Sequence, residues 1–353
     1  MENMWWTHIR QAMDFVEEIT EKAYLGQSLL LAFPNQVPWS DELFDAVEAQ
    51  LRTRNPEFRA VMLREEDGDP EPLMLDRFCR RETRARYRSA IGAAKFLAEQ
   101  PDSTLHSSYV WVRISSDTAM KKWISFASEY VRCIKNGEKK GAFIIECSNM
   151  GSVSRVKGLH VLDWSVSIDS YDAFTYCALC SSNVSISKSL RAYLVDLAAN
   201  VCQTDVELGQ ACINQGRGLL EDPETALRQI AESEVRSSGE PFEIEINPEN
   251  LQTKTWESQV RIAFSVIEKL RMSFVNKYSR DIMRCLPITD AYGNTIDTLQ
   301  KVELGQVLRF VGERKVVVSP ADYDKIAFLR DCRNDLAHIK PLCLEDLAQL
   351  LEM

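Results

Sequence analysis

Short apolar runs recur along the first 170 residues, separated by stretches of helix length, and this alternation constrains the fold more than any other feature of the sequence. Short continuous apolar runs are typical of parallel strands that are buried on both faces. The runs span residues 28–33, 58–63, 109–114, 142–146 and 159–162. Helices are predicted before and between them, including 6–25, 39–51 and 118–135. We therefore expect an α/β domain with a mostly parallel sheet over residues 1–171.

The rest of the chain is predicted to be helical. Residues 172–240 form a helical extension, which ends in a linker where Gly239 and Pro241 break the periodicity. Residues 250–353 are predicted to form an all-α domain that resembles a four-helix bundle. Its first helix carries apolar residues three and four apart, and three shorter helices follow. The four helices are expected at 252–283, 302–310, 319–337 and 344–351.

The order of elements in residues 1–171 resembles the core of P-loop NTPases. The run SLLLAF takes the place of the first strand, and AFIIE the place of the strand that ends in an acidic residue. The helical extension is similar to the lid of AAA-type ATPases. The phosphate loop is missing, because residues 34–39 (Pro-Asn-Gln-Val-Pro-Trp) have neither glycine nor a Lys-Ser/Thr pair. We expect the shape of an NTPase domain with no cofactor, and Glu146 is interpreted as a strand-end acid with a structural partner.

The segment Arg333-Asn-Asp-Leu-Ala-His338 places an arginine and one of only four histidines on a predicted helix. An arginine can hold a phosphate through two hydrogen bonds, and a histidine that titrates near neutrality can move protons during RNA cleavage. The segment resembles the motif of the HEPN superfamily, in which arginine, often followed by a polar residue, precedes histidine. The resemblance covers the predicted C-terminal helical domain.

The HEPN resemblance implies a role for each residue of the motif. Arg333 would stabilise the phosphate, Asn334 would orient it by hydrogen bonding, and His338 would act as general acid or base, without a metal. In the structural alternative, Arg333 and His338 pair with Asp331 or Asp335, or cap a helix end.

A second pair, Arg155 and His160, has the same spacing. Gly158 interrupts any helix between them, and His160 enters a strand-like run. This pair is therefore interpreted as structural.

Four arginines near the middle of the α/β domain are candidate contacts to RNA or phosphate. On a continuous helix they would share one face, and Phe78 or Tyr87 could stack a base. The acidic residues just upstream could instead pair with them and leave a solvated face. The four are Arg77, Arg81, Arg84 and Arg88.

The net charge of −10 is unevenly distributed. From Asn250 onward, 15 Lys and Arg accompany 14 Asp and Glu, so the acidic excess lies upstream. A broad phosphate-binding surface is therefore not expected, and any RNA contact should be local.

Ten cysteines without regular spacing, a charged N-terminal segment and the lack of a long apolar run indicate a cytoplasmic protein with reduced thiols and no membrane segment. Cys177 and Cys180 form the one close pair, and no second pair of ligands accompanies them. Buried thiols rather than a metal site are expected.

Two functions compete. The first is a metal-independent endoribonuclease or toxin-like effector, in which the NTPase-like domain senses or docks a partner protein. The HEPN resemblance then implies a homodimer through the C-terminal bundle, which brings two motifs together. The second is a non-catalytic binding or regulatory subunit in which both domains are interaction scaffolds. A third reading, an active NTPase, needs phosphate-binding residues that the sequence does not display.

Overall fold

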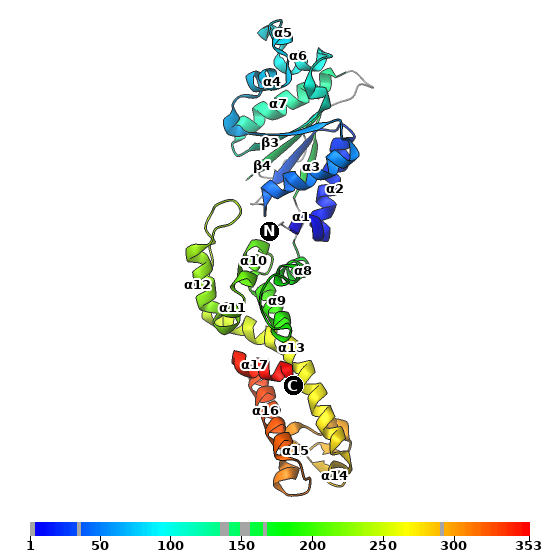
Figure 1. The fold of residues 1–353 in the computed structure, drawn as a ribbon, viewed down its shortest axis with the longest axis vertical. Coiled ribbons are helices and arrows are strands. Elements are labelled where there is room, and N and C mark those ends of the chain that lie inside the picture. Colours follow the sequence, from blue (N-terminus) through cyan, green and yellow to red (C-terminus); the bar gives the residue numbers. More distant parts are fainter. Residues whose placement is uncertain (1–3, 34–36, 135–140, 149–155, 165–167, 290–292) are drawn as a thin grey trace. The chain divides into compact units, whose positions relative to one another are not determined.

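The computed structural model describes residues 4–33, 37–134, 141–148, 156–164, 168–289 and 293–353 (Figure 1). The chain forms two compact units, one of residues 1–168 with 237–239 and one of residues 169–236 with 240–353. The sequence suggests three domains, whereas the structure groups the helical extension and the C-terminal helices in one unit. None of the helices in the described ranges has both the length and the apolar character needed to span a bilayer.

The described part of the first unit contains a five-stranded sheet in the order β2-β3-β4-β1-β5, and every neighbouring pair is parallel. The strand β1 is buried along its whole length, because it lies inside the sheet. This is an α/β arrangement with a parallel sheet, so the predicted fold class is confirmed. The strands are β1 (Leu29–Phe33), β2 (Arg59–Arg64), β3 (Ser108–Ile114), β4 (Ala142–Ser148) and β5 (His160–Asp163).

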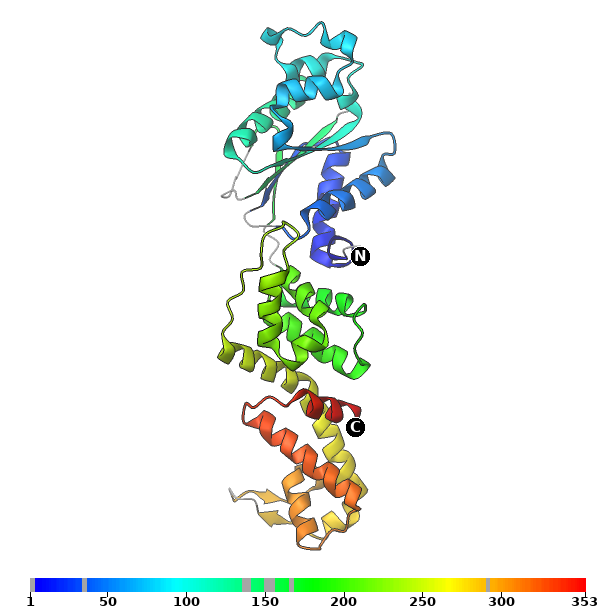
Figure 2. The ribbon, with the colours of Figure 1, turned by 60° about the vertical axis from the view of Figure 1, so that its left-hand side comes forward.

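Helices cover both faces of this sheet, with α2 and α3 on one face and α4, α6 and α7 on the other (Figure 1 and Figure 2). The helix α7 begins at a serine cap, since Ser116 Oγ accepts the Ala119 amide. Its Phe126 and Tyr130, four residues apart, pack on Phe143 of the sheet. The helices are α1 (Trp5–His8), α2 (Arg10–Tyr24), α3 (Ser40–Arg54), α4 (Pro70–Phe78), α5 (Arg81–Arg84), α6 (Ala93–Glu99) and α7 (Asp117–Cys133).

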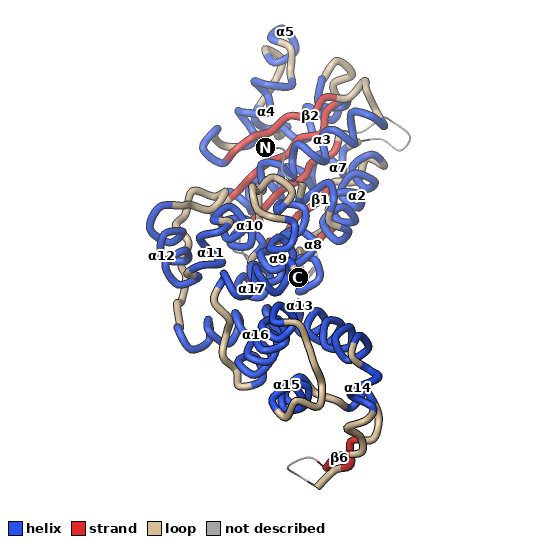
Figure 3. The backbone as a smooth tube through the Cα atoms, turned by 60° about the horizontal axis from the view of Figure 1, so that its bottom comes forward, coloured by secondary structure: helices blue, strands red, loops and turns tan. Residues whose placement is uncertain are grey.

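The second unit is helical apart from a small hairpin of β6 (Ile288–Thr289) and β7 (Thr295–Ile296), which was not predicted (Figure 3). The long helix ends at Lys277 rather than at 283, and a short helix follows. The helices are α8 (Ser170–Ser181), α9 (Lys188–Cys202), α10 (Val206–Gln215), α11 (Arg217–Glu221), α12 (Pro223–Ser233), α13 (Pro248–Lys277), α14 (Ser279–Met283), α15 (Leu304–Gly312), α16 (Pro320–Ala337) and α17 (Leu344–Glu352).

The buried side of α13 includes polar residues that the predicted apolar stripe did not contain. Gln259 and Arg271 are buried, whereas Val260 and Phe264 are only half-buried. Arg271 donates to two backbone carbonyls ahead of α15, including that of Val302 at 2.8 Å. The long helix therefore positions the chain around it through hydrogen bonds as well as through apolar packing.

Candidate functional site

Glu146, the acidic residue that the sequence predicted at the end of its strand, lies on β4 and is 2% exposed. Both carboxylate oxygens accept hydrogen bonds from β3. Trp111 Nε1 donates to one at 2.7 Å, and Arg113 Nε donates to the other at 3.0 Å. Arg113 is held in turn by the Asp41 carboxylate and by the Ser40 carbonyl. The structural partner expected for Glu146 is therefore present, but Glu146 lies within β4, which continues to Ser148, rather than at the end of the strand.

Glu146 and Glu65, which directly follows β2, have shifted pKa values for different reasons. Burial raises the pKa of the Glu146 carboxyl, while Arg113 and the Trp111 indole act in the opposite direction. Hydrogen bonds from Ser116 and Ser115 lower the pKa of Glu65 to about 2. The Glu65 carboxylate therefore accepts hydrogen bonds from the start of α7, as the Glu146 carboxylate accepts them from the neighbouring strand.

The helix that follows β1 begins at a tryptophan. Trp39 has a φ of 49°, and its amide donates to the Ser237 hydroxyl at 2.9 Å. Trp6 Nε1 donates to the Trp39 carbonyl at 2.9 Å. Asp41 lies in the first turn of α3, where a negative charge is favourable near the positive end of the helix dipole, and its carboxylate pairs with Arg113. Residues 34–36 of the predicted loop lie outside the described residues.

An aromatic cluster surrounds Trp39. The Trp5 ring lies 6.4 Å from that of Trp39 and 6.3 Å from that of Trp6, centroid to centroid. Trp164 extends the cluster, at 5.2 Å from Trp6 and 4.8 Å from Phe15. The start of α3 is therefore enclosed by side chains that the sequence analysis did not connect with it.

The second candidate site lies on α16, whose start agrees with the sequence. The Ser319 hydroxyl accepts the Asp322 amide at 3.1 Å, and Pro320 occupies the first helical position. Leu329 and Leu336 are buried on the predicted apolar side.

His338 follows the last turn of α16 and serves as its C-cap residue. The Ile339 amide donates to the Leu336 carbonyl at 3.3 Å, and the Lys340 amide donates to the Asp335 carbonyl at 2.9 Å, which closes the helix end. The His338 side chain is exposed, and no described residue forms a hydrogen bond or ion pair with its ring. The backbone of His338 therefore caps the end of α16, as the structural alternative expected.

Arg333 is half exposed, and Asn334 is exposed. Within the described chain, the ion pair of Arg333 is with Glu303, at 3.9 Å between Nη2 and Oε2. Asp331 and Asp335, the acids considered as alternative partners, pair with other basic residues. Neither the arginine nor the histidine of the motif is thus neutralised by the acids beside it in sequence.

Two residues of α13 fix the backbone around His338, and the sequence analysis missed their role. Trp256 Nε1 donates to the Leu336 carbonyl at 2.6 Å. Gln259, buried, donates to the Leu342 carbonyl at 2.9 Å and accepts the Leu342 amide at 2.7 Å. A glutamine on the core side of a helix was the available signal, because a buried amide requires partners.

Ile339 adopts a left-handed backbone conformation, with a φ of 60°, and its side chain is exposed. This conformation costs a residue with a Cβ about 1–2 kcal/mol, whereas glycine loses about 0.5–1 kcal/mol in chain entropy. We predict that Ile339→Gly raises the free energy of unfolding by up to about 1 kcal/mol, measured by urea unfolding. Ile339→Val keeps the strain and should not stabilise. A less stable glycine variant would contradict this account.

The prediction of one continuous helix face of arginines is wrong. α4 ends at Phe78, and Cys79 is extended, with φ of −115° and ψ of 132°. The Phe78 carbonyl accepts the hydroxyls of Ser103 and Thr104 at 3.3 and 3.4 Å, so tertiary contacts end the helix there. The four arginines therefore lie on separate elements. Arg77 is on α4, Arg81 and Arg84 are on α5, and Arg88 follows α5.

These four arginines are nevertheless exposed. Arg84 pairs with Asp76, and Arg88 donates to backbone carbonyls. No described acidic residue forms an ion pair with Arg77 or Arg81. The alternative in which the acidic residues just upstream pair with these arginines therefore does not apply to Arg77 and Arg81.

The predicted base-stacking aromatics are not available on this segment. Phe78 is buried, and the Tyr87 ring packs edge-on against Phe96 at 5.3 Å. Any nucleic-acid contact here would be to phosphate rather than to a base.

His160 opens β5, where its amide donates to the Ser28 carbonyl at 2.9 Å, and Arg155 lies outside the described residues. Cys177, Cys180 and Cys202 are buried in the second unit. Among the residues that the structure describes, no group of three or more His, Cys, Asp or Glu side chains could hold a metal ion.

No protein-family model and no curated protein matches the chain. Solved structures that are similar to it include Drosophila ORC bound to DNA, with 12% identity and a TM-score of 0.42 over 98% of this chain and 95% of that one. AMPPCP-bound DnaA from Aquifex aeolicus has 14% identity and a TM-score of 0.38 over 73% and 81% of the two chains. RuvB from Thermotoga maritima has 10% identity and a TM-score of 0.36 over 71% and 76%. At such identities and TM-scores these similarities assign no family to the chain.

Proposed function

We propose that this chain is a non-hydrolysing regulatory or docking subunit, whose AAA-like unit has the shape of an ATPase core without its nucleotide chemistry. The observation that carries the proposal is the Glu146 carboxylate, whose two oxygens are engaged by Trp111 and Arg113. In P-loop NTPases, acidic and polar side chains near the phosphates hold magnesium or orient the attacking water. An acid that is bound on both oxygens within the sheet is not available for that work.

The start of α3 supports the same proposal. Phosphate binding at a helix start depends on open backbone amides and on the positive end of the helix dipole. Here the Trp39 amide is bonded to the Ser237 hydroxyl, and Asp41 adds a negative charge in the first turn. Both features disfavour a bound triphosphate.

We predict that Mg-ATP does not bind the full chain with micromolar affinity. Calorimetric titration should give no saturating heat, and millimolar Mg-ATP should leave the melting temperature unchanged, because only a bound ligand stabilises the folded state. The Glu146→Gln variant is the control, since it removes the acid that an ATPase would use. A micromolar dissociation constant for the unmodified chain, or ATP hydrolysis that is lost in this variant, would contradict the proposal.

The accessibility of Arg333 and His338 favours a second candidate function, metal-independent cleavage of RNA by the second unit. Arg333 would bind the scissile phosphate and Asn334 would orient it. His338 would exchange protons with the ribose 2′-OH and the leaving 5′-oxygen. The 2′-oxygen then forms a bond to phosphorus as the 5′-oxygen leaves, which yields 2′,3′-cyclic phosphate and 5′-OH ends.

A homodimer through the second unit belongs to this second candidate. Val260 and Phe264 of α13 are only half-buried within one chain, so they offer apolar surface to a second copy. A symmetric contact would supply two copies of Arg333 and His338. RNA cleavage should then fall steeply on dilution below the dimer dissociation constant.

A further inference from the structure

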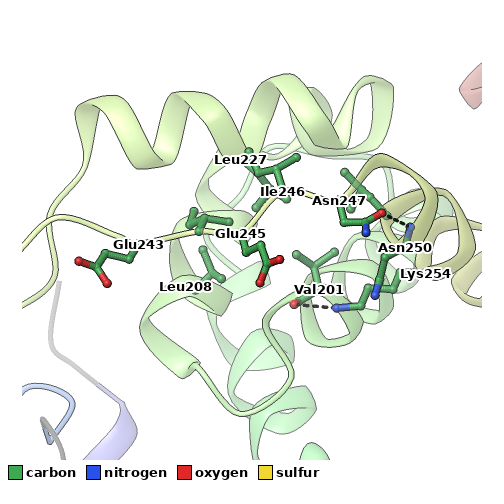
Figure 4. Close-up of a pocket in the computed structure, with 11 residues that line it drawn as sticks. Val201, Leu208, Leu227, Glu243, Glu245, Ile246, Asn247, Asn250 and Lys254 are labelled. Atoms are coloured by element: carbon green, nitrogen blue, oxygen red, sulfur yellow. Dashed lines mark hydrogen bonds between the residues drawn. The ribbon is translucent and has the colours of Figure 1, made fainter.

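A stretch of extended chain in the second unit, residues 242–246, has the side-chain pattern of a strand without a strand beside it. Phe242 is buried, Ile244 and Ile246 are half-buried, and Glu243 and Glu245 are exposed. In Figure 4, Ile246 points toward Leu227 and Glu243 extends away from it. The stretch lines a cavity of about 290 Å³ together with Val201, Leu208, Leu227, Leu251 and Lys254.

Beyond an antiparallel bridge between Val235 and Pro241, this stretch has no strand paired with it in the described chain. Within the described ranges, no backbone hydrogen bond involves an amide or carbonyl of residues 243–246. An extended chain with free donors and acceptors is a template on which another strand can pair. The stretch thus has the property of an exposed sheet edge although it belongs to no sheet.

Both ends of the stretch are fixed in place. At its start, the Arg236 guanidinium lies 4.6 Å from the centroid of the Phe242 ring and forms ion pairs with Asp205 and Glu207. At its end, the Asn247 side chain accepts an amide of the first turn of α13 at 3.1 Å. An incoming strand would therefore find the backbone already extended, which lowers the entropy lost on binding.

The negative charge of the stretch favours a basic partner strand over a second copy of this chain. Residues 242–248 contain two glutamates, Glu243 and Glu245, and no lysine or arginine. A second copy paired through the same residues would place glutamates opposite glutamates, and like charges across a strand pair are destabilising. Lysine or arginine at alternate positions of an incoming strand would instead meet Glu243 and Glu245.

We propose that residues 242–246 are a strand-addition site for an extended, basic segment of a partner protein. Backbone hydrogen bonds supply the affinity, and Glu243 and Glu245 supply the selection for a basic strand. The site is separate from Glu146 and from Arg333 and His338, and its test does not depend on ATP or RNA.

The probe is a labelled peptide, Lys-Val-Lys-Val-Lys-Val, titrated with the full chain at physiological salt and followed by fluorescence anisotropy. Saturable binding is expected. Two control peptides carry N-methyl groups on alternate amides, one for each edge of the strand. N-methylation leaves the charge unchanged and removes donors on one edge, so one of the two should bind at least about tenfold more weakly. Equal binding of all three peptides would overturn strand addition.

The matched protein variants test the charge selection. Glu243→Lys with Glu245→Lys should weaken the basic peptide about tenfold or more and should admit the Glu-Val counterpart peptide. Glu249→Lys, an exposed change outside the stretch, should alter binding little. Melting temperatures establish that each variant is folded. The proposal is overturned by no binding at millimolar peptide, by an unaffected double variant, or by self-association that the double variant strengthens.

Discussion

His338→Ala is expected to lower the rate of RNA cleavage in the presence of EDTA by about 100-fold or more, and Arg333→Ala by a similar factor. Both residues would act in one transition state, so the double variant should lose little beyond either single change. The rate is measured on purified full-length protein with a labelled RNA. Mass spectrometry of the fragments should find 2′,3′-cyclic phosphate ends, because the 2′-oxygen is the nucleophile.

The chain offers matched controls for this experiment. Arg330→Ala removes another arginine from α16, one that pairs with Asp331. His160→Ala removes an exposed histidine that lies in the other unit. Neither should change the rate. Cleavage that persists in both His338→Ala and Arg333→Ala would reject the ribonuclease and leave the binding subunit as the function.

The exposed arginines of the first unit can be tested on the same RNA. We propose that Arg77 and Arg81 bind phosphate, and neutral substitutions there should raise KM and leave kcat unchanged. Arg84→Ala should matter less, because Arg84 already pairs with Asp76. A fall in kcat with unchanged KM would contradict a role of Arg77 and Arg81 in binding alone.

Arg113→Ala is expected to lower the free energy of unfolding by about 3–5 kcal/mol, because it leaves the buried Glu146 carboxylate without its cation. Arg113 is mostly buried and also bonds Asp41 and the Ser40 carbonyl, so one change removes several contacts. Chemical denaturation at neutral pH measures the loss. Arg64→Ala is the matched control, since Arg64 lies farther from Asp41, at 3.9 Å, and is half exposed.

Two further measurements identify the orphaned charge as the cause. Adding Glu146→Gln to Arg113→Ala should recover part of the lost stability. The loss should also shrink at lower pH, since burial raises the pKa of Glu146 and the variant lacks Arg113, the charged one of the two groups that oppose this rise. The folded variant then binds a proton that the unfolded chain does not, so its free energy of unfolding increases as pH falls through that pKa. A deficit that is equal at every pH would contradict this explanation.

The fold of the first unit was largely predictable, because short continuous apolar runs such as 28–33, separated by stretches of helix length, are typical of buried parallel strands. Local caps were equally informative, as Ser319 and Pro320 show for α16. The break after Phe78 was not predictable, since the hydroxyls that bind its carbonyl come from residues 103 and 104. Such tertiary contacts override the helix propensity of the local sequence.

The candidate sites were predictable in part. Residue types pointed to Arg333 and His338, and the absence of glycine pointed to a lost phosphate loop. The hydrogen bonds from Trp256 and Gln259 to the end of α16 and the segment after it could not be read from one sequence, because they join residues about 80 positions apart. The same holds for Arg113, whose partner Glu146 became visible only once β3 and β4 were in register.

The serine that receives the Trp39 amide lies 198 positions later in the chain. Ser237–Gly239 belong to the first unit, although the residues on either side of them belong to the second. A fragment that stops at residue 168, or at the sequence-based boundary of 171, would therefore lack part of its own fold, including the Ser237 hydroxyl that accepts the Trp39 amide. The first unit is therefore not one continuous piece of sequence, and its chemistry should be tested on a chain that includes residues 237–239.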